Sequence, residues 1–325
     1  MTSPTRWGIL GTGSIAKKFA EGLAALPEAR LVAVGSRTAE AAAAFGERYQ
    51  VPHRHASYEA LARDSEIEAI YISTPHTLHC ENTLLCLAEG KAVLCEKPFA
   101  INAAQASQMV EAARRRGVFL MEAMWTRCLP VMGWVRQQLP QVGQVRLVNA
   151  DFGFRAGYNR QSRLFAPELG GGALLDVGIY VLSFASMILG PRPVQLASAA
   201  NLGESGVDEQ TSLLLSYADG AQATLTCAVR TTTPQEARII GTEGMIQIDA
   251  PFWKGTAATL RTGGGQVRAD FPLQGNGYNY EAAEVGRCLR AGEKESSIMP
   301  LEETLAIMQL MDQARAQWGL RYPME

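Results

Sequence analysis

The sequence predicts an α/β protein of two domains, and three observations lead to this prediction. The chain has 325 residues, which is more than a single hydrophobic core usually organises. Up to residue 124, short apolar strand patterns alternate with helical patterns. Beyond that residue, longer β-type runs take over. We therefore expect a parallel-sheet domain in residues 1–124 and an α+β domain with an open, mainly antiparallel sheet in residues 125–325.

The first domain begins with a β-α-β pattern. Residues 6–26 read as a short apolar strand, a glycine turn and an amphipathic helix, and residues 29–37 supply a second strand. The same rhythm predicts helices in residues 39–49, 78–89 and 103–116, and strands in residues 69–73, 92–95 and 118–122. Strands that alternate with helices form a parallel sheet that is covered on both faces.

The second domain contains four runs typical of β-strands, in residues 144–154, 194–202, 210–231 and 236–251. Asp219 and Gly220 lie between alternating apolar residues of the third run and predict a hairpin. An apolar helix in residues 174–189 is expected to pack on the sheet, and another helix is expected in residues 301–317. We expect the open sheet to expose a broad apolar face, which predicts a homodimer.

Composition narrows the class of partner. The 30 basic and 32 acidic residues give a net charge of −2, which argues against nucleic acid or an anionic membrane and favours a small molecule. The six cysteines are scattered without a C-x-x-C pair, which predicts a reduced, cytoplasmic protein. The first residues lack a secretory pattern, and the apolar run in residues 179–190 is too short to span a bilayer.

The stretch GILGTGSIA matches the pattern G-x-G-x-x-A at the junction of a strand and a helix. Gly11 permits the tight turn, Gly13 lets a pyrophosphate approach the main chain, and Ala16 allows close packing of the helix. Free N–H groups at the start of the helix attract phosphate. The first domain is therefore predicted to be a dinucleotide-binding Rossmann domain, with cofactor contacts from Gly11, Thr12, Gly13, Ser14 and Ile15.

The end of the second strand decides which cofactor we expect. NAD-binding domains usually have an acid here, whereas this chain has Ser36, Arg37 and Thr38. These side chains suit a 2′-phosphate, with Arg37 forming a charge-assisted fork. We therefore expect NADP rather than NAD. The alternative interpretation is that Arg37 and Thr38 only open a surface helix.

Two groups of polar residues are candidates for the chemistry. Lys97 follows the strand in residues 92–95, at the carboxyl edge where open α/β sheets bind ligands. It is expected to bind a substrate hydroxyl and to lower the pKa of a neighbouring phenol. Asp176 and Tyr180 are four residues apart on the apolar helix and therefore share one face. The alternatives are a solvated lysine, an aspartate that interacts with the helix dipole and a core tyrosine.

These motifs together resemble the Gfo/Idh/MocA family of NAD(P)-dependent oxidoreductases. The resemblance rests on the glycine turn, on EKP after the strand in residues 92–95, and on GGALLDVGIY in the second domain. The stretches MEAMWTRCLP, MPLEETL and WGLRYP are similar to the dimeric dihydrodiol dehydrogenase branch, which includes NADP-dependent D-xylose dehydrogenases. Tyr180 also matches this branch, because many other branches have histidine there. The likeness extends over essentially the whole chain.

The resemblance implies roles for individual residues. Lys97 and Tyr180 would act on the reacting hydroxyl or carbonyl group, and Asp176 would hold and polarise them. The implied cofactor contacts are Thr74, Pro75, His79, Glu96 and Lys97, while His76 replaces the asparagine that the family often has. The implied substrate contacts, besides Asp176 and Tyr180, are Trp125, Arg127, Phe154 and Tyr158, and the remaining aromatic candidates are Trp253, Tyr278 and Tyr280.

We expect reversible hydride transfer between NADP and a secondary alcohol or carbonyl group of a sugar or cyclic diol, with Tyr180 exchanging the proton. This requires Lys97, Tyr180 and the reactive carbon of the cofactor to meet at one point. A NAD-dependent glycosidase of the same family and a non-catalytic dinucleotide-binding sensor are the alternatives. No metal is expected, because no cysteine or acid completes a recognisable ligand set with His53, His55, His76 and His79.

Overall fold

The structure is a computed structural model that describes residues 3–325 and divides into two compact units. Unit 1 contains residues 3–100, 104–125 and 274–304, and unit 2 contains residues 101–103, 126–273 and 305–325. Residues 274–304 thus belong to unit 1, although they lie in the range expected for the second domain. They belong there because helix α8 (Tyr278–Ala291) packs against α1 (Ser14–Leu23).

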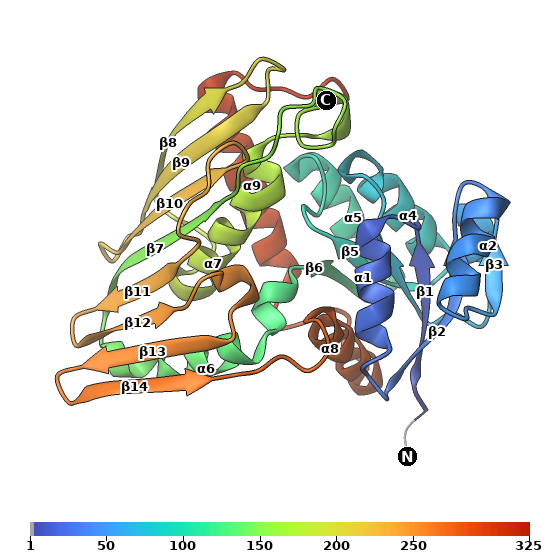
Figure 1. Cartoon of the computed structure of the whole chain (residues 1–325), viewed down its shortest axis with the longest axis horizontal. Coiled ribbons are helices and arrows are strands. Elements are labelled where there is room, and N and C mark those ends of the chain that lie inside the picture. The colour runs from blue at the N-terminus through green and yellow to red at the C-terminus, as the bar shows by residue number, and fades with distance from the viewer. Residues whose placement is uncertain (1–2) are drawn as a thin grey trace. The chain divides into compact units, whose positions relative to one another are not determined.

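Unit 1 is built on a parallel sheet with the order β3-β2-β1-β4-β5-β6 (Figure 1). Its strands are β1 (Thr5–Leu10), β2 (Ala29–Gly35), β3 (His53–His55), β4 (Ala69–Ile72), β5 (Ala92–Glu96) and β6 (Leu120–Ala123). Besides α1 and α8, its helices are α2 (Ala39–Arg48), α3 (Tyr58–Ala62), η1 (His76–Leu78), α4 (His79–Ala88) and α5 (Ala103–Arg116). Ala103, the first residue of α5, is assigned to unit 2. The strand order reverses between β1 and β4, and open α/β sheets bind ligands at the carboxyl ends of such strands.

Burial explains why the sequence predicted this sheet well. Every residue of β4 and β5 is buried, as expected for parallel strands with covered faces. Phe19 of α1 stacks on Tyr71 of β4 with ring centroids 3.7 Å apart, which fixes this helix on the sheet. Strand β3 and helix α3 were not predicted, because segments of three and five residues are too short to show a period.

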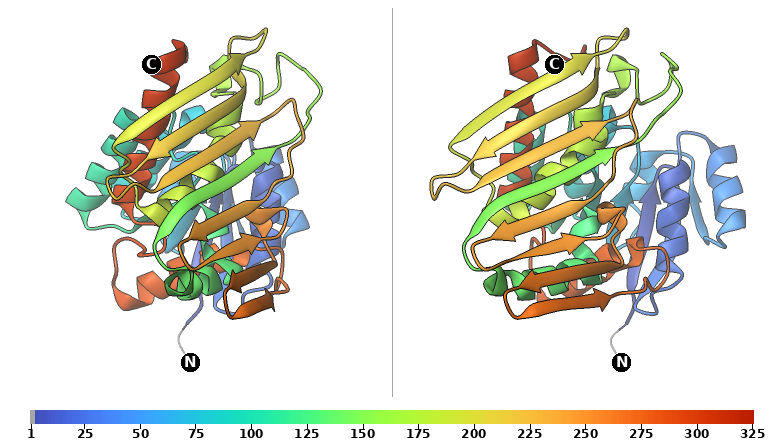
Figure 2. Two further views of the ribbon diagram at one scale, coloured as in Figure 1. Left: turned by 90° about the vertical axis from the view of Figure 1, so that its left-hand side faces the viewer. Right: turned by 60° about the vertical axis from the view of Figure 1, so that its left-hand side comes forward.

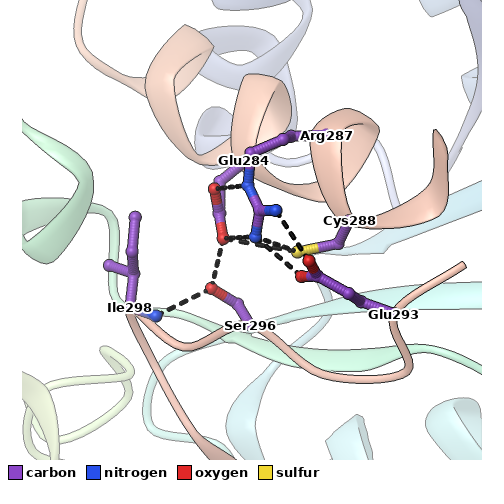
Figure 3. Close-up of polar contacts among 6 residues, drawn as sticks. All are labelled: Glu284, Arg287, Cys288, Glu293, Ser296 and Ile298. Carbon is purple, nitrogen blue, oxygen red and sulfur yellow. Dashed lines mark hydrogen bonds and ion pairs between the residues drawn. The ribbon is translucent and has the colours of Figure 1, made fainter. Parts of the chain in front are cut away.

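A polar cluster joins the end of α8 to the loop that follows it (Figure 3). Glu284 accepts hydrogen bonds from Arg287 Nε at 2.8 Å and from the hydroxyl of Ser296 at 2.6 Å. Arg287 also donates to Glu293 at 2.8 Å, and Ser296 accepts from the amide of Ile298 at 3.0 Å. These bonds fix the return of the chain after the helix, although the sequence pattern predicted neither α8 nor this loop.

Unit 2 is built on an eight-stranded sheet with the order β14-β13-β12-β11-β7-β10-β9-β8. Its strands are β7 (Val145–Gly153), β8 (Gln195–Leu202), β9 (Asp208–Ser216), β10 (Gln222–Ala228), β11 (Ala237–Gly241), β12 (Gly244–Ile248), β13 (Ala257–Thr262) and β14 (Gly265–Asp270). Its helices and turns are η2 (Trp125–Cys128), α6 (Pro130–Gln138), η3 (Leu139–Val142), η4 (Pro167–Leu169), α7 (Ile179–Leu189), η6 (Phe252–Lys254) and α9 (Leu301–Trp318). Trp125 of η2 and residues 301–304 of α9 are assigned to unit 1.

The strand pairing of unit 2 confirms a mainly antiparallel sheet. The exception is β7, which pairs in parallel with β10, from Leu147 beside Gln222 to Gly153 beside Ala228. β9 and β10 form the predicted hairpin, in which Gly220 has a φ of +85° and Asp219 accepts the amide hydrogen of Ala221 at 3.1 Å. The short side chain of an aspartate and the freedom of a glycine suit this turn.

The apolar helix of unit 2 begins differently from the expectation. Its first turn, η5 (Leu174–Gly178), is π-helical, and the regular α-helix α7 begins only at Ile179. A π-helical turn is wider than an α-helical one and frequently occurs at functional sites. Asp176 therefore lies in a widened turn, one turn before Tyr180, rather than in a continuous α-helix.

This apolar segment also meets the length and composition criteria for a membrane-spanning helix. The segment Pro167–Leu189 is longer than the run in residues 179–190, but 83% of its most apolar window is buried within the protein. Such burial is typical of a helix that forms part of a protein core.

The two faces of the eight-stranded sheet differ. α7 and η5 contact the inner sides of β7 and β10, where Val148, Ala150, Leu225 and Cys227 are buried. Among the residues that the structure describes, no helix of unit 2 covers the outer face (Figure 2). The expectation of a broad apolar face there is wrong, because small polar residues alternate with few exposed leucines. Its central outward-facing residues are Asn149, Asp151, Ser212, Leu214, Thr224 and Thr226.

Candidate active site

The glycine turn of unit 1 leaves the start of α1 open. Gly11 has a φ of +105°, and a Cβ there would lie 2.9 Å from the hydroxyl of Ser73. A Cβ at Gly13 would meet no atom within 4 Å, and within residues 3–325 no side chain caps this helix. Ser14 and Ile15 form the first turn of the helix, so their main-chain amides face this open space. The turn therefore fits the pyrophosphate of a dinucleotide.

A cavity of unit 1 adjoins the end of β2. It has a volume of about 670 Å³ and is lined by Arg37, Tyr58, Leu78 and neighbouring residues. The hydroxyl of Ser36 lies 3.4 Å from that of Thr12, which links this segment to the glycine turn. The hydroxyl of Thr38 accepts the amide hydrogen of Ala41 at 3.2 Å and so caps α2. This contact agrees with the alternative interpretation, in which Thr38 opens a surface helix.

His79 connects two loops at the carboxyl edge of the sheet. Its Nδ1 lies 2.8 Å from the carbonyl oxygen of Pro98, and its Nε2 lies 3.0 Å from that of Thr74. Asn82 donates to the hydroxyl of Thr74 at 3.1 Å, which further fixes the Thr74–Pro75 turn. Complete burial lowers the pKa of His79, and its contacts with main-chain carbonyl oxygens oppose this effect. His79 thus holds the loop after β4 against the loop after β5.

Lys97 follows a buried carboxylate. The hydroxyl of Tyr71 donates a short hydrogen bond to Glu96, and burial keeps the pKa of Tyr71 well above its ordinary value, so this group stays a donor. The other oxygen of Glu96 accepts the main-chain amide of Lys97 at 3.2 Å. Glu281 of α8 is also fully buried. Burial, followed by the charge of Glu96, raises the pKa of Glu281 well above its ordinary value.

Three of the expected aromatic residues also belong to unit 1. Trp125 is buried and stacks on Tyr278 with ring centroids 4.8 Å apart and an interplanar angle of 17°. Tyr280 has a different contact, because its hydroxyl accepts the main-chain amide hydrogen of Gln274 at 2.9 Å. Trp125 and Tyr278 therefore form one aromatic surface, while Tyr280 holds the start of α8.

Unit 2 places Asp176 beside an arginine that the sequence analysis did not identify. Arg163 Nη1 donates to Asp176 Oδ1 at 2.8 Å. Asp176 is buried in η5, whereas Arg163 comes from the irregular segment between β7 and η4 and is largely exposed. A buried carboxylate is stabilised by such a charged hydrogen bond.

Tyr180 lies in an aromatic group within unit 2. Its ring makes edge contacts with Phe152, at 5.2 Å, and with Trp253, at 6.4 Å between centroids. Phe152 stacks on Trp253 at 4.9 Å, and the indole N–H of Trp253 donates to Gln235 at 3.1 Å. Phe154 is next to this group, with its ring 6.4 Å from that of Phe152. The ring of Tyr180 is therefore held from several sides.

Arg127 and Tyr158 lie apart from the aromatic group's centre. Arg127 is buried and donates to Ser183 through two hydrogen bonds of 2.8 Å, one to the hydroxyl and one to the main-chain carbonyl. Ser183 is on α7, three residues after Tyr180, so Arg127 fixes the helix that carries the tyrosine. Tyr158 is exposed and contacts Phe165 edge-on at 5.2 Å.

A second carboxylate of unit 2 holds the π-helical turn. Asp208 accepts the amide hydrogen of Leu174 at 2.7 Å and the hydroxyl hydrogen of Thr211 at 2.9 Å. Gly172 has a φ of +121°, and a Cβ there would lie 2.3 Å from Asp208 Oδ1. Complete burial raises the pKa of Asp208 to about 7, although its hydrogen bonds oppose the increase.

Comparison with known proteins assigns both parts of the chain. A model of an oxidoreductase family with an NAD-binding Rossmann fold matches residues 5–124, and a model of the GFO/IDH/MocA C-terminal domain matches residues 139–247. The chain belongs to the Gfo/Idh/MocA family. It is therefore an oxidoreductase with a Rossmann domain that binds NAD or NADP, which confirms the family, fold class and enzyme class that the sequence predicts.

Similarity to individual Gfo/Idh/MocA proteins extends over the full length. The trans-1,2-dihydrobenzene-1,2-diol dehydrogenase of Xenopus tropicalis is 39% identical, over 98% of this chain and 99% of that protein. The Homo sapiens protein of the same name is 37% identical, over 98% of both. Among solved structures, an aldose-aldose oxidoreductase from Caulobacter crescentus has a TM-score of 0.87 at 26% identity, over 98% of both chains. The 3-ketoreductase KijD10 from Actinomadura kijaniata, in complex with NADP and TDP-benzene, has a TM-score of 0.84 at 25% identity, over 97% of this chain and 98% of that chain.

Sequence reasoning missed several residues of this Gfo/Idh/MocA protein that support the expected groups. Phe152 could have been found, because strand alternation places it on the same face as Phe154. Arg163, Asp208 and Glu281 had no such signal, since their partners are distant in the sequence or on elements that were not predicted.

Proposed function

We propose that this protein is an NADP-dependent oxidoreductase that interconverts a secondary alcohol and a carbonyl group of a sugar or cyclic diol. The observation that carries the proposal is the arrangement of Asp176 and Tyr180 in unit 2, where the carboxylate is bound by Arg163 and the phenol ring is held by aromatic residues. Full-length relatives named for a dihydrodiol and a structural neighbour named for aldoses support this class of substrate.

The open turn at Gly11 and Gly13 would hold the pyrophosphate of the cofactor, and the segment from Ser36 to Thr38 would hold its adenosine end. Arg37 supports NADP over NAD, because a guanidinium binds a 2′-phosphate with two hydrogen bonds and β2 ends without an acid. When bound, the nicotinamide supplies the hydride acceptor or donor of the reaction.

The remaining chemistry belongs to the side chains. In the oxidising direction, the phenolic oxygen of Tyr180 accepts the proton of the substrate hydroxyl, and it returns this proton in the reducing direction. The ammonium group of Lys97 donates a hydrogen bond to the same substrate oxygen and favours the phenolate form of the tyrosine. Asp176, oriented by Arg163, holds these groups in place. Because Lys97 and Tyr180 belong to different units, the proposal requires both to reach one substrate.

The activity test uses the purified full-length chain with NADP⁺ or NAD⁺ and a panel of aldopentoses, aldohexoses and cyclic diols. We expect net reduction of NADP⁺, followed through the absorbance of the reduced nicotinamide, with at least one class of substrate. Hydrolysis of a glycoside without a net change in this absorbance would instead identify the NAD-dependent glycosidase. Cofactor binding without turnover of any substrate or glycoside would identify the sensor.

We also propose a homodimer that forms through the outer face of the eight-stranded sheet. The support is that no described helix of unit 2 covers this face and that Leu147 and Leu214 are exposed on it. In light scattering coupled to gel filtration, the protein should have twice its 35.1 kDa chain mass, and Leu214→Glu should shift it to the monomer. A monomeric wild type would reject the dimer. The six cysteines are free, which supports a reducing, cytoplasmic location, and the net charge of −2 supports partners other than nucleic acid or membrane.

A further inference from the structure

Two histidines and one aspartate of unit 1 converge away from the glycine turn and from Lys97. His53 Nδ1 lies 2.6 Å from Asp64 Oδ2, and His55 Nε2 lies 2.9 Å from the same oxygen. One ligand atom from each residue lies within 4.8 Å of the other two. The expectation that no acid joins these histidines is therefore wrong. The sequence did not reveal the acid because Asp64 is brought to β3 by the turn after α3.

Contacts within the protein hold these three side chains close together. His53 and His55 are two residues apart on β3, so they project from the same side of this strand. Asp64 is fixed from behind, because its Oδ1 accepts the amide hydrogen of Glu66 at 2.9 Å and its main-chain carbonyl accepts from Lys91 Nζ at 2.6 Å. The ammonium group of Lys91 thus binds the main chain and leaves Oδ2 of Asp64 to the imidazoles.

The exposure of the three side chains suits a site that opens to solvent. The side chain of Asp64 is 7% exposed, while those of His53 and His55 are 40% and 24% exposed. Asp64 therefore presents its carboxylate from a buried position, and the two imidazoles approach it from the solvent side.

The ligand types select the class of ion. Two imidazole nitrogens and one carboxylate oxygen are common ligands of zinc and of related divalent transition ions, and three protein ligands leave a fourth position for water. Around a tetrahedral zinc ion, neighbouring ligand atoms are separated by about 3.3 Å. The two nitrogen–oxygen distances, 2.6 Å and 2.9 Å, would need to lengthen by roughly 0.7 Å and 0.4 Å. Rotation of the partly exposed imidazole rings can provide this change.

We propose that His53, His55 and Asp64 form a binding site for a divalent transition ion of the zinc class. The bound ion replaces the hydrogen bonds between the imidazoles and the carboxylate and ties β3, which pairs only with β2, to the turn before β4. This site is separate from the groups of the proposed function and does not depend on it. The main-chain carbonyl of His55 accepts the amide hydrogen of Ser36 at 3.1 Å, so the ion is held by the strand that supports the end of β2.

The experiment is isothermal titration calorimetry of the chelator-treated, full-length protein with zinc chloride. We expect saturable binding of about one ion per chain, and an affinity at least about tenfold lower in the variants His55→Gln and Asp64→Asn, since each removes a ligand. Glu66→Gln is the matched control, because its carboxyl group is two residues from Asp64 and is not one of the three converging groups. This control should bind zinc with wild-type affinity.

Cobalt(II) provides a second measurement that separates this site from the cysteines. The wild type loaded with cobalt should show visible d–d bands without thiolate-to-metal charge transfer, and Asp64→Asn should lose these bands. Charge-transfer bands, or equal zinc affinity in the wild type and both site variants, would overturn the proposal. So would the absence of saturable zinc binding below about 1 mM in the wild type. If His55→Gln has an altered circular dichroism spectrum, His53→Asn replaces it, because the side chain of His53 is the more exposed of the two.

Discussion

Arg163 donates a 2.8 Å hydrogen bond to Asp176, and the two partners differ sharply in their environment. The side chain of Arg163 is 58% exposed, whereas that of Asp176 is 7% exposed. Water can solvate the arginine when the pair is broken, but it cannot readily solvate the aspartate. Removing the arginine therefore affects mainly the state and position of the carboxylate.

We predict that Arg163→Met lowers kcat by about 10- to 100-fold without a comparable loss of NADPH affinity, because the loss of a charged hydrogen bond of this kind is equivalent to roughly 1.5–3 kcal/mol. Arg163→Lys should recover part of the activity, since it keeps the charge but not the planar donors. Because Arg163 acts through Asp176, the pH profile of kcat/KM should also move in Arg163→Met.

The matched control is Arg160→Met. Arg160 is in the same segment and pairs with Glu168 at 2.9 Å, but both partners of this pair are exposed. Its removal should leave kcat and the pH profile unchanged. Equal effects of the two substitutions would show that this segment acts through its flexibility and not through Asp176.

For Tyr180, we predict that Tyr180→Phe lowers turnover by about 10²- to 10⁴-fold, the range for removal of a general acid or base. The phenylalanine ring can keep the edge contacts with Phe152 and Trp253, so NADPH binding and the midpoint of thermal unfolding should change little. Stopped-flow turnover and fluorescence titration with NADPH measure the two effects.

Tyr217→Phe is the control, because Tyr217 is another buried tyrosine of unit 2, and this variant should retain wild-type turnover. Near-normal turnover of Tyr180→Phe would remove Tyr180 from the mechanism.

The fold was predictable where the sequence pattern is local. The glycine turn, the buried strands of unit 1 and the hairpin at Asp219 and Gly220 each depend on neighbouring residues, and the structure confirms them. The position of α8 was not predictable in the same way, because it is determined by packing against α1, some 260 residues earlier in the chain. The π-helical turn is another such case, since its geometry depends on the distant carboxylate of Asp208.

In the candidate site, too, residues in local motifs were predictable and residues that depend on distant contacts were not. Motif reasoning identified Lys97, Asp176 and Tyr180 but not the residues that hold them. Arg163 lies in an irregular segment with no period, and Glu281 approaches Glu96 only because α8 returns to unit 1. The pairing of His53 and His55 with Asp64 has the same origin, because a short helix and a turn close a contact that no spacing in the sequence encodes.

The cavity beside Arg37 leads to a prediction about cofactor choice. Arg37→Gln should weaken NADPH binding by about 10- to 100-fold, the equivalent of roughly 1.5–3 kcal/mol for charged hydrogen bonds, and should change NADH binding much less. Fluorescence titration with both cofactors measures this ratio. Arg63→Gln is the control. Arg63 directly follows α3, which contacts β2, but it pairs with Glu89 and does not line the cavity. An unchanged ratio of NADPH to NADH affinity in Arg37→Gln would mean that Arg37 only precedes the surface helix α2 and does not bind the cofactor.

Asp208 leads to a prediction about stability and pH. Its pKa in the folded protein is about 7, whereas an unfolded aspartate has a pKa of about 3.9. Between these values the folded state binds more protons than the unfolded state, so this residue makes the free energy of unfolding fall as the pH rises from about 4 to 7. The slope is at most about 1.4 kcal/mol per pH unit for one proton.

Asp208→Asn tests this effect because it keeps the carbonyl oxygen that accepts from Leu174 and Thr211 while removing the ionisation. The variant should be less stable than or equal to the wild type near pH 4 and should gain stability relative to it as the pH approaches 8. Urea denaturation at several pH values measures the difference, and Glu204→Gln, at an exposed carboxyl four residues away, should show no such trend. A constant difference between Asp208→Asn and the wild type from pH 4 to 8 would mean that Asp208 is ionised throughout this range and that its hydrogen bonds outweigh the cost of burial.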